Sequence, residues 1–253
     1  MKKRLKRVLQ RLLGLHAYLV LHGVLLANTI RFRSNEGGIL QLIRRLQPDA
    51  CVLDIGANVG AMTLLLARKC RKGRVYGFEP IPENFHAAQT LLRLLRVHNA
   101  QLFEYALGDR EETVEMVTPD YNGVTMSGLS YVVTAAHPRR NGGAVYRVPL
   151  VPLDSVATLR NARIDAMKID VEEHEQYVLR GARETIERNR PIIYCELWAA
   201  ENRQNVMEFL KELHYVPYVA TNRRLCPYEE NPRAGINFLF VPQEREAELA
   251  GIP

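Results

Sequence analysis

A strand that runs directly into a glycine turn and a helix is the feature that most constrains this chain. Residues 50–53 are apolar and partly β-branched, as expected of a strand buried on both faces. The sequence then changes abruptly to acidic, amide and glycine positions, namely Asp54, Gly56, Asn58 and Gly60. An apolar, helix-compatible run follows over 61–67. The turn therefore opens onto the free amide groups of a helix N-terminus, where a ligand can approach the backbone.

The spacing of the two glycines predicts the kind of ligand. Gly56 and Gly60 are separated by three residues, whereas dinucleotide-binding folds place G-x-G-x-x-G around a pyrophosphate. A carboxylate at Asp54 would repel pyrophosphate. It would attract a cationic ligand, such as the sulfonium and amino groups of S-adenosylmethionine.

A second carboxylate stands at the end of the next predicted strand. Residues 74–78 have strand character, and Glu79 follows them, nineteen positions after Gly60. A carboxylate there can accept both hydroxyls of a nucleotide ribose. The alternative for Asp54 and Glu79 is that each only caps the following helix, but two such acids one βαβ unit apart favour a nucleotide site.

The alternating pattern over 101–107 predicts a third strand. In a doubly wound sheet its end borders the adenine edge, which makes Ala106 and Leu107 candidate cofactor contacts, with ordinary packing at a strand end as the alternative. Residues 112–147 then interrupt the alternation of strands and helices with repeated turn signals. Such a long excursion predicts a lid over a substrate, or else a solvent-exposed hairpin.

A second group of ionisable residues lies in the predicted strand that begins near residue 166. Because side chains alternate along a strand, Lys168, Asp170 and Glu172 are expected on one side of it, with His174 just beyond. Burying such groups costs free energy, so that buried ones are expected to form ion pairs or to have a role in a functional site. The structural alternative is a Lys168–Asp170 ion pair with carboxylates at the start of a helix over 176–189.

The complete pattern predicts an α/β domain over 35–253. Five strand–helix units are followed by a closing pair of strands at 215–220 and 236–241. This is the layout of a class I, Rossmann-like methyltransferase, with a mostly parallel seven-stranded sheet whose last strand runs antiparallel.

Residues 1–34 form a separate basic extension. An apolar face is predicted for the first helix, made by Leu5, Val8, Leu9, Leu12 and Leu13. The stretch 12–30 carries no formal charge, so the extension could lie on anionic lipid, pack on the domain, or span a bilayer. The basic start would keep that end in the cytoplasm, and a span would then separate the domain from its cofactor. We therefore expect a cytoplasmic protein that contacts the inner face of the membrane at most peripherally.

The charge distribution disfavours a nucleic-acid enzyme. The formal net charge is +6, but eight positive residues precede Glu36 without any acid, which leaves the remainder at −2. A duplex-binding domain would need its own basic stripe. The four cysteines show no C-x-x-C pairing, so that no zinc site and no disulfide framework are predicted.

Five motifs, in this order, resemble the FkbM-type methyltransferase family over about residues 50–200. They are Asp54–Gly60, Phe78–Asn84, Ala106–Asp109, Leu153–Ser155 and Lys168–Glu172. The resemblance implies a class I fold, S-adenosylmethionine as cofactor, and methylation of a hydroxyl on a sugar, glycolipid or similar small natural product.

The resemblance also implies roles for individual residues. The motif residues Asp54, Gly56, Asn58 and Gly60 would form the methionine side of the cofactor pocket, with Glu79 at the ribose. One departure is Glu173, which stands where the family usually has glycine in Asp-Val-Glu-Gly-x-Glu. It adds a side chain and a charge beside the acceptor pocket, and it keeps open a non-catalytic cofactor-binding or membrane-scaffold protein as an alternative.

These residues suggest how a hydroxyl would be methylated. Glu172 or His174 is the candidate general base, Asp170 would orient the acceptor, and Lys168 would hold Asp170 charged. A magnesium ion between Asp170 and Glu196 is a less favoured alternative, because the following Leu197 supplies no further oxygen ligand. A nucleic-acid methyltransferase is the other alternative, but the chain has no Asn-Pro-Pro-Tyr motif.

Overall fold

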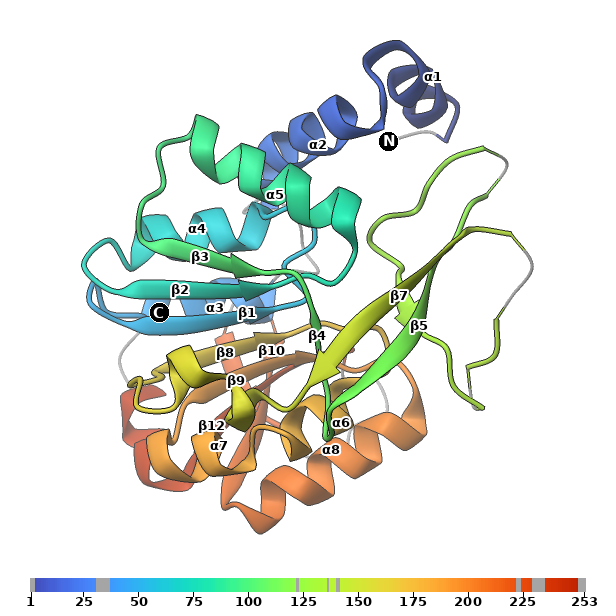
Figure 1. The fold of residues 1–253 in the computed structure, drawn as a ribbon. Coiled ribbons are helices and arrows are strands. Elements are labelled where there is room, and N and C mark those ends of the chain that lie inside the picture. The colour runs from blue at the N-terminus through green and yellow to red at the C-terminus, as the bar shows by residue number, and fades with distance from the viewer. Residues whose placement is uncertain are drawn as a thin grey trace.

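A twisted sheet with helices on both faces forms the body of the protein (Figure 1). The computed structural model describes residues 3–30, 37–121, 123–135, 137–139, 142–221, 224–228 and 235–249. The strand order is β11-β10-β12-β9-β8-β1-β2-β3. The strands are β1 (Cys51–Ile55), β2 (Arg74–Phe78), β3 (Ala100–Phe103), β8 (Ala166–Ile169), β9 (Ile192–Glu196), β10 (Tyr215–Thr221), β11 (Arg224–Pro227) and β12 (Asn237–Pro242).

The direction of the strands confirms the predicted class I fold. β1 pairs in parallel with β2 and β8, whereas β12 runs antiparallel between β9 and β10. The sheet has eight strands instead of the predicted seven, because β11 adds to β10 as an edge hairpin. The chain builds outward from β1 to β3 and then returns to β8 on the other side of β1. The carboxyl ends of β1 and β8 therefore flank the topological switch point, where open α/β sheets bind ligands.

Two apolar cores lie on opposite faces of this sheet. One face is covered by α3 (Gly37–Arg45), α4 (Ala61–Lys69) and α5 (Pro82–Leu94), and the other by α6 (Glu175–Arg180), α7 (Arg183–Asn189) and α8 (Ala200–Glu212). The predicted single helix over 176–189 is in fact two helices. The break falls at Gly181–Ala182, and the Asp154 carboxylate caps α7 by accepting hydrogen bonds from the backbone N–H groups of Glu184 and Thr185, both at 2.9 Å.

The prediction of one strand over 101–107 is wrong at its end. β3 stops at Phe103, and β4 (Ala106–Leu107) belongs to a second sheet of order β4-β7-β5-β6. β3 is the edge of the main sheet, so beyond Phe103 the backbone finds partners in β7 (Ala144–Val151) instead. β5 (Glu112–Thr118) and β6 (Tyr131–Val132) complete this small sheet, which projects beside the carboxyl ends of the main strands (Figure 1).

The second ionisable group also departs from strand geometry. β8 ends at Ile169, and Glu172 and Glu173 have φ values of 52° and 71° in the left-handed region. The prediction that Lys168, Asp170 and Glu172 share one side of a continuous strand is therefore wrong after Ile169, because the backbone turns there.

The N-terminal extension contains two helices. α1 (Lys3–Leu13) and α2 (Leu15–Thr29) are separated by Gly14, whose φ of 75° interrupts the helix. α2 buries Tyr18, Leu19 and Ala27 and lies along α5 and α4, so this part of the extension packs on the domain. Within the described ranges, no helix combines the length and apolar character that crossing a bilayer requires. Of the basic residues before Glu36, Lys2, Arg31 and Arg33 lie outside the described residues.

Candidate functional site

Three cavities meet at the carboxyl ends of β1, β2 and β8. The strand-end cleft is lined by Gly56, Phe78, Glu79, Tyr105, Asp170 and Glu172, among others. The turn pocket lies behind the glycine turn and shares Gly56, Asn58 and Asp170 with the cleft. The insertion cavity lies against the small sheet and shares Glu172 with the cleft.

The glycine turn brings the backbone close to both neighbouring strands. Gly56 and Gly60 have φ values of 78° and 79°. A Cβ at Gly56 would collide with the backbone carbonyl oxygen of Asp170, and the N–H groups of Gly56 and Ala57 both donate to the Phe78 carbonyl oxygen, at 3.0 and 2.9 Å. Glycine is therefore required at position 56 both by conformation and by space.

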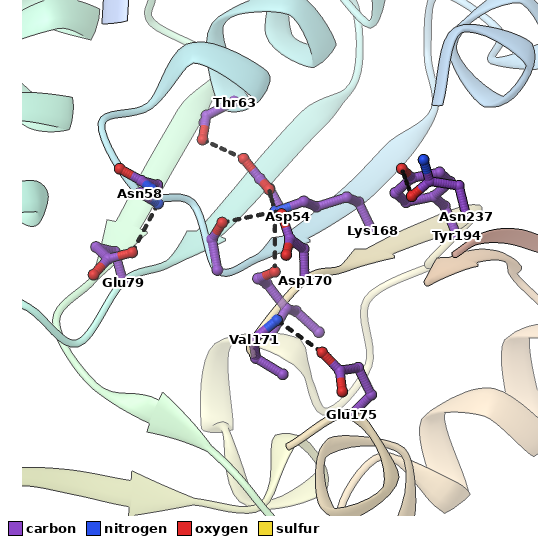
Figure 2. A network of polar contacts seen from close by, with 12 residues as sticks. Asp54, Asn58, Thr63, Glu79, Lys168, Asp170, Val171, Glu175, Tyr194 and Asn237 are labelled. Carbon is purple, nitrogen blue, oxygen red and sulfur yellow. Dashed lines mark hydrogen bonds and ion pairs between the residues drawn. The ribbon is translucent and has the colours of Figure 1, made fainter. Parts of the chain in front are cut away.

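Asp54 lies behind this turn and not in the open cleft. Its side chain is 0% exposed, its Oδ2 accepts a hydrogen bond from Thr63 at 2.6 Å, and its Oδ1 lies 3.3 Å from Lys168 Nζ (Figure 2). Its carboxylate is thus occupied by protein groups. The geometry gives Asp54 a role in positioning the turn and Lys168, whereas the sequence prediction placed it directly on the cofactor.

Lys168 connects β8 to the turn. Its Nζ donates to the carbonyl oxygen of Gly56 at 2.7 Å and to that of Ile55 at 3.3 Å, and it lies 3.5 Å from Asp170 Oδ2. Burial works to lower the pKa of Lys168, but the carboxylates of Asp54 and Asp170 outweigh this effect and raise the pKa above its usual value. The predicted pairing with Asp170 is present, and the same ammonium also fixes the turn.

Glu79 lies at the end of β2, and protein groups already occupy most of the hydrogen-bond acceptor positions of its carboxylate. Its Oε2 accepts the Asn58 N–H at 2.7 Å, and its Oε1 accepts the Ile81 N–H at 3.0 Å and the Asn84 side-chain amide at 3.3 Å. A carboxylate offers about four acceptor positions. Glu79 can therefore accept one further hydroxyl, and not both ribose hydroxyls as its position in the sequence indicates.

A wall of aromatic and apolar side chains lies beside Glu79. Phe78 stacks on Phe103 with ring centroids 5.0 Å apart, and Tyr105 lies 5.7 Å from Phe78. Ala106 and Leu107, the predicted adenine-edge residues, line the same cleft as Glu79. Tyr105 was missed because its position between two strands follows from the change of sheet, which the local pattern did not reveal.

Glu172 and His174 line the other side of the cleft. Burial raises the pKa of Glu172 to about 8. The nearby carboxylates also raise this pKa, and Asp170 has the largest effect among them. Burial lowers the pKa of His174 to about 4, so the imidazole is neutral at physiological pH. Its Nε2 is buried and has no hydrogen-bond partner among the described residues.

Glu175, which the predicted site does not include, holds the turn after β8 in place. Its Oε1 accepts the Val171 N–H at 3.1 Å (Figure 2). Its Oε2 accepts the Asn202 side-chain amide at 2.5 Å. Burial raises its pKa to about 7. Glu175 was missed because the turn that it holds, with left-handed backbone at Glu172 and Glu173, has no clear signature in the local sequence.

The insertion closes over the strand-end cleft through a backbone group. The Ser127 carbonyl oxygen accepts hydrogen bonds from the side-chain amides of Asn84 at 3.0 Å and Asn58 at 3.4 Å. Asn58 therefore connects the glycine turn to the insertion as well as to Glu79. A main-chain acceptor has no sequence signature, so this contact could not be predicted.

The donors for a metal ion are few. Asp170 and Glu196, the predicted magnesium alternative, both line the turn pocket. Among the residues that the structure describes, no group of three or more histidine, cysteine, aspartate or glutamate side chains is arranged to hold a metal ion. Magnesium prefers near-octahedral coordination by oxygen. Two carboxylates would fill only part of this coordination shell, so that water and substrate would have to supply most of the ligands.

The backbone explains why Glu173 is unusual at its position. Its φ of 71° is the conformation that glycine adopts without penalty, whereas other L-residues pay about 1–2 kcal/mol. Its Oε1 accepts the Ala199 N–H at 2.8 Å, so the side chain ties this turn to the start of α8.

We expect Glu173→Gly to unfold at higher denaturant concentration than Glu173→Ala. Both variants lose the hydrogen bond to Ala199, but only alanine keeps the left-handed strain. The difference should be about 1 kcal/mol in the free energy of unfolding, measured by urea denaturation. Equal stabilities would show that the turn is not strained at this position.

Sequence comparisons place the chain among methyltransferases. The sequence model of the methyltransferase FkbM domain matches residues 54–217. AMB antimetabolite synthetase AmbE from Pseudomonas aeruginosa is 32% identical over 169 residues, covering 54% of this chain. Methyltransferase 1 from Beauveria bassiana is 25% identical over 149 residues, covering 53% of this chain. The chain spans 8% and 58% of the lengths of these two relatives.

The fold has a counterpart among solved structures. The crystal structure of methyltransferase FkbM from Methylobacillus flagellatus KT matches with a TM-score of 0.55 and 15% identity. The match covers 90% of this chain and 55% of that one. At this identity the likeness supports the architecture and not the substrate.

Proposed function

This chain belongs to the FkbM methyltransferase family, and from that premise we propose that it methylates a hydroxyl group on a sugar, glycolipid or other small natural product. Membership supports S-adenosylmethionine-dependent methyl transfer as the activity. We propose this activity for the protein together with the oxygen acceptor, its chemical class and the residues that act on it.

The described residues fit this cofactor. When bound, S-adenosylmethionine supplies a methyl group activated by the sulfonium charge. Phe78, Tyr105 and Leu107 offer an apolar wall for an adenine ring, and Glu79 can accept a ribose hydroxyl beside it. Gly56 and Asn58, which line both the cleft and the turn pocket, would receive the methionine part, and Gly60 would keep the turn open.

We assign the role of general base to Glu172 because of its position. It lines both the strand-end cleft and the insertion cavity, so an acceptor in that cavity and a cofactor in the cleft would meet beside its carboxylate. A hydroxyl is a poor nucleophile until its proton is removed. Glu172 would take that proton while the acceptor oxygen takes the methyl group, and Asp170, held by Lys168, would orient the acceptor.

His174 is the second candidate for the base. Its imidazole is neutral at physiological pH, and its buried Nε2 is available to a ligand. Its low pKa makes it a weaker base than Glu172, whose pKa of about 8 is close to the value that general bases need. We therefore assign the proton transfer to Glu172.

We expect the affinity for S-adenosylmethionine to rise with pH. Burial raises the pKa of Glu79 to about 7 and that of Glu172 to about 8, so both carboxyls are partly protonated in the free protein. A cationic ligand favours their ionised forms, and binding therefore releases protons. Between about pH 6 and pH 8, the affinity should increase by up to about tenfold per pH unit for each proton released.

S-adenosylhomocysteine is the matched control for this measurement, because it lacks the sulfonium charge. Its dissociation constant, measured by titration calorimetry over the same pH range, should change less. Equal slopes for the two ligands would show that the charge of the cofactor is not what the carboxylates recognise.

Turnover should survive exhaustive removal of divalent metal. The proposed chemistry uses a carboxylate base and positions the acceptor with protein groups, so no step depends on a bound cation. Activity should stay within about twofold after dialysis against a chelator, because no general-base contribution is lost. A loss that added magnesium restores would favour the alternative in which Asp170 and Glu196 hold the ion.

The proposed acceptor class has support from charge and from one relative. The basic residues Arg68, Arg71, Lys72 and Arg74 gather where β2 begins, at the opposite strand ends from the cleft, so they do not form a nucleic-acid track leading to it. The name of AmbE describes an antimetabolite synthetase, which agrees with small-molecule chemistry. We place the reaction in the cytoplasm, where the cofactor is made.

Transfer of a mass-labelled methyl group into fractionated cell extract tests the acceptor. The label should appear as a methyl ether in the glycan, lipid or small-molecule fraction. Label in RNA or on nitrogen would contradict the proposal while leaving methyltransferase activity intact.

A further inference from the structure

Helix α1 keeps its apolar stripe in solvent. Leu5, Val8 and Leu12 lie on one face of the helix and are 49%, 50% and 77% exposed, and Leu13 beside them is 45% exposed. Of the predicted apolar face of this helix, Leu9 packs against the buried Tyr18 and Leu19 of α2, whereas the other four residues are exposed. A continuous exposed apolar stripe on a helix indicates a surface that binds something else.

A groove between α1 and α2 extends this apolar surface. The lining of this α1–α2 groove includes Lys6, Leu9, Tyr18, Leu21 and Leu25. Leu21 and Leu25 are themselves exposed and lie one turn apart on α2. The groove is thus lined mainly by apolar side chains, with the cationic Lys6 beside them.

The charge of the same helix selects the kind of partner. α1 has the sequence KRLKRVLQRLL, with five basic residues and no acid, and the first acidic residue of the chain is Glu36. Leucine side chains on one side and cations on the other are the pattern of a helix that lies in the plane of a lipid interface. A basic surface of this kind is attracted to anionic headgroups.

We propose that α1, together with the α1–α2 groove, docks the protein on an anionic phospholipid surface. Leu5, Val8 and Leu12 enter the acyl boundary, while Lys6 and Arg11 meet the headgroups. The proposal does not depend on the nature of the methyl acceptor.

Helix α1, which would dock on the lipid, is also hydrogen-bonded to the insertion. Gln10 Nε2 donates to the Thr125 carbonyl oxygen at 3.3 Å, and the Thr125 N–H donates to Gln10 Oε1 at 3.4 Å. Two residues further along, the Ser127 carbonyl oxygen is held by Asn58 and Asn84 over the strand-end cleft. A lipid-bound α1 therefore keeps the insertion beside the bilayer.

Cosedimentation of the full chain with lipid vesicles tests the proposal. The wild-type protein should bind vesicles of mixed phosphatidylcholine and phosphatidylglycerol and should bind vesicles of phosphatidylcholine alone much more weakly. The triple variant Leu5→Gln/Val8→Gln/Leu12→Gln should lose most of this binding. Because these side chains are exposed, its Tm and its affinity for S-adenosylmethionine should stay at the wild-type values, which excludes misfolding.

Leu94→Gln is the matched control, because Leu94 is 66% exposed on α5, outside the proposed surface. It should bind mixed vesicles like the wild type. Replacing Lys6 and Arg11 by glutamine should weaken binding by about fivefold for each cation removed. Equal binding to the two vesicle types, no binding to either, or full binding by the triple variant would overturn the proposal.

Discussion

Replacing Glu172 by glutamine is expected to lower kcat by about 10²- to 10⁴-fold, which is the usual contribution of a general base. Glutamine has nearly the same shape but cannot accept the proton of the acceptor hydroxyl. The dissociation constant for S-adenosylmethionine, measured separately by calorimetry, should change by less than about tenfold, because the cofactor contacts other residues as well.

Glu173→Gln is the matched control for this experiment. Glu173 is the next residue and also lines the insertion cavity, but it does not line the strand-end cleft. Its kcat should stay within about threefold of the wild type, since it has no place in the proton transfer. Equal losses in the two variants would indicate a general effect of charge or of the turn and would remove Glu172 from the mechanism.

The pH profile of kcat/KM for the acceptor, measured at saturating S-adenosylmethionine so that cofactor binding does not contribute, separates the two candidate bases. With Glu172 as the base, the rate should rise toward a plateau above a pKa of about 8, whereas with His174 it should already be level above about 4. The Glu172→Gln variant should lose the inflection near 8. An unchanged inflection in that variant would assign it to another group.

The second large effect is expected from Lys168→Met. This substitution removes the ammonium from Asp54, which is 0% exposed and would keep only Thr63 as a partner. Breaking a buried ion pair from one side costs about 3–5 kcal/mol. For a protein of this size, Tm should therefore fall by roughly 10 °C in a thermal scan.

A second substitution tests whether the uncompensated charge is the cause. Asp54→Asn in the Lys168→Met background should recover part of the lost stability, because the buried charge is then gone. The same change in the wild-type background should be destabilising. A Tm for Lys168→Met equal to that of the wild type would contradict the role of Lys168 in holding the turn.

Local patterns were sufficient where the structure depends on neighbouring residues. The apolar run before Asp54 and the helical pattern after Gly60 predicted β1 and α4 to within a few residues, because a buried strand and a helix each have a clear sequence signature. The parallel order of the central strands followed from their alternation with helices.

The errors arose where distant segments decide the conformation. Ala106 and Leu107 pair with β7, more than forty positions further along the chain, and nothing in the local alternation distinguishes this from pairing in the main sheet. The turn after Ile169 depends on left-handed backbone at Glu172 and Glu173. Glutamate rarely adopts this conformation, so the sequence did not predict the turn.

The same distinction applies to the candidate site. Residue type and spacing were enough to place Glu79, Asp170 and Glu172 around one cleft. They could not reveal that Asp54 faces Lys168 and Thr63, since burial depends on the packed structure. Nor could they reveal that the insertion is held over the cleft by a carbonyl oxygen of its own backbone.

Titration calorimetry with the purified full chain most directly tests the central claim, which is that the glycine turn and the cleft carboxylates Glu79 and Glu172 form a site for a cationic methyl donor. We predict saturable binding of S-adenosylmethionine at one site per chain and no binding of NAD under the same conditions. Gly56→Ala, which places a methyl group against the Asp170 carbonyl oxygen, should abolish that binding. Binding of NAD, or no affinity for S-adenosylmethionine, would contradict the account.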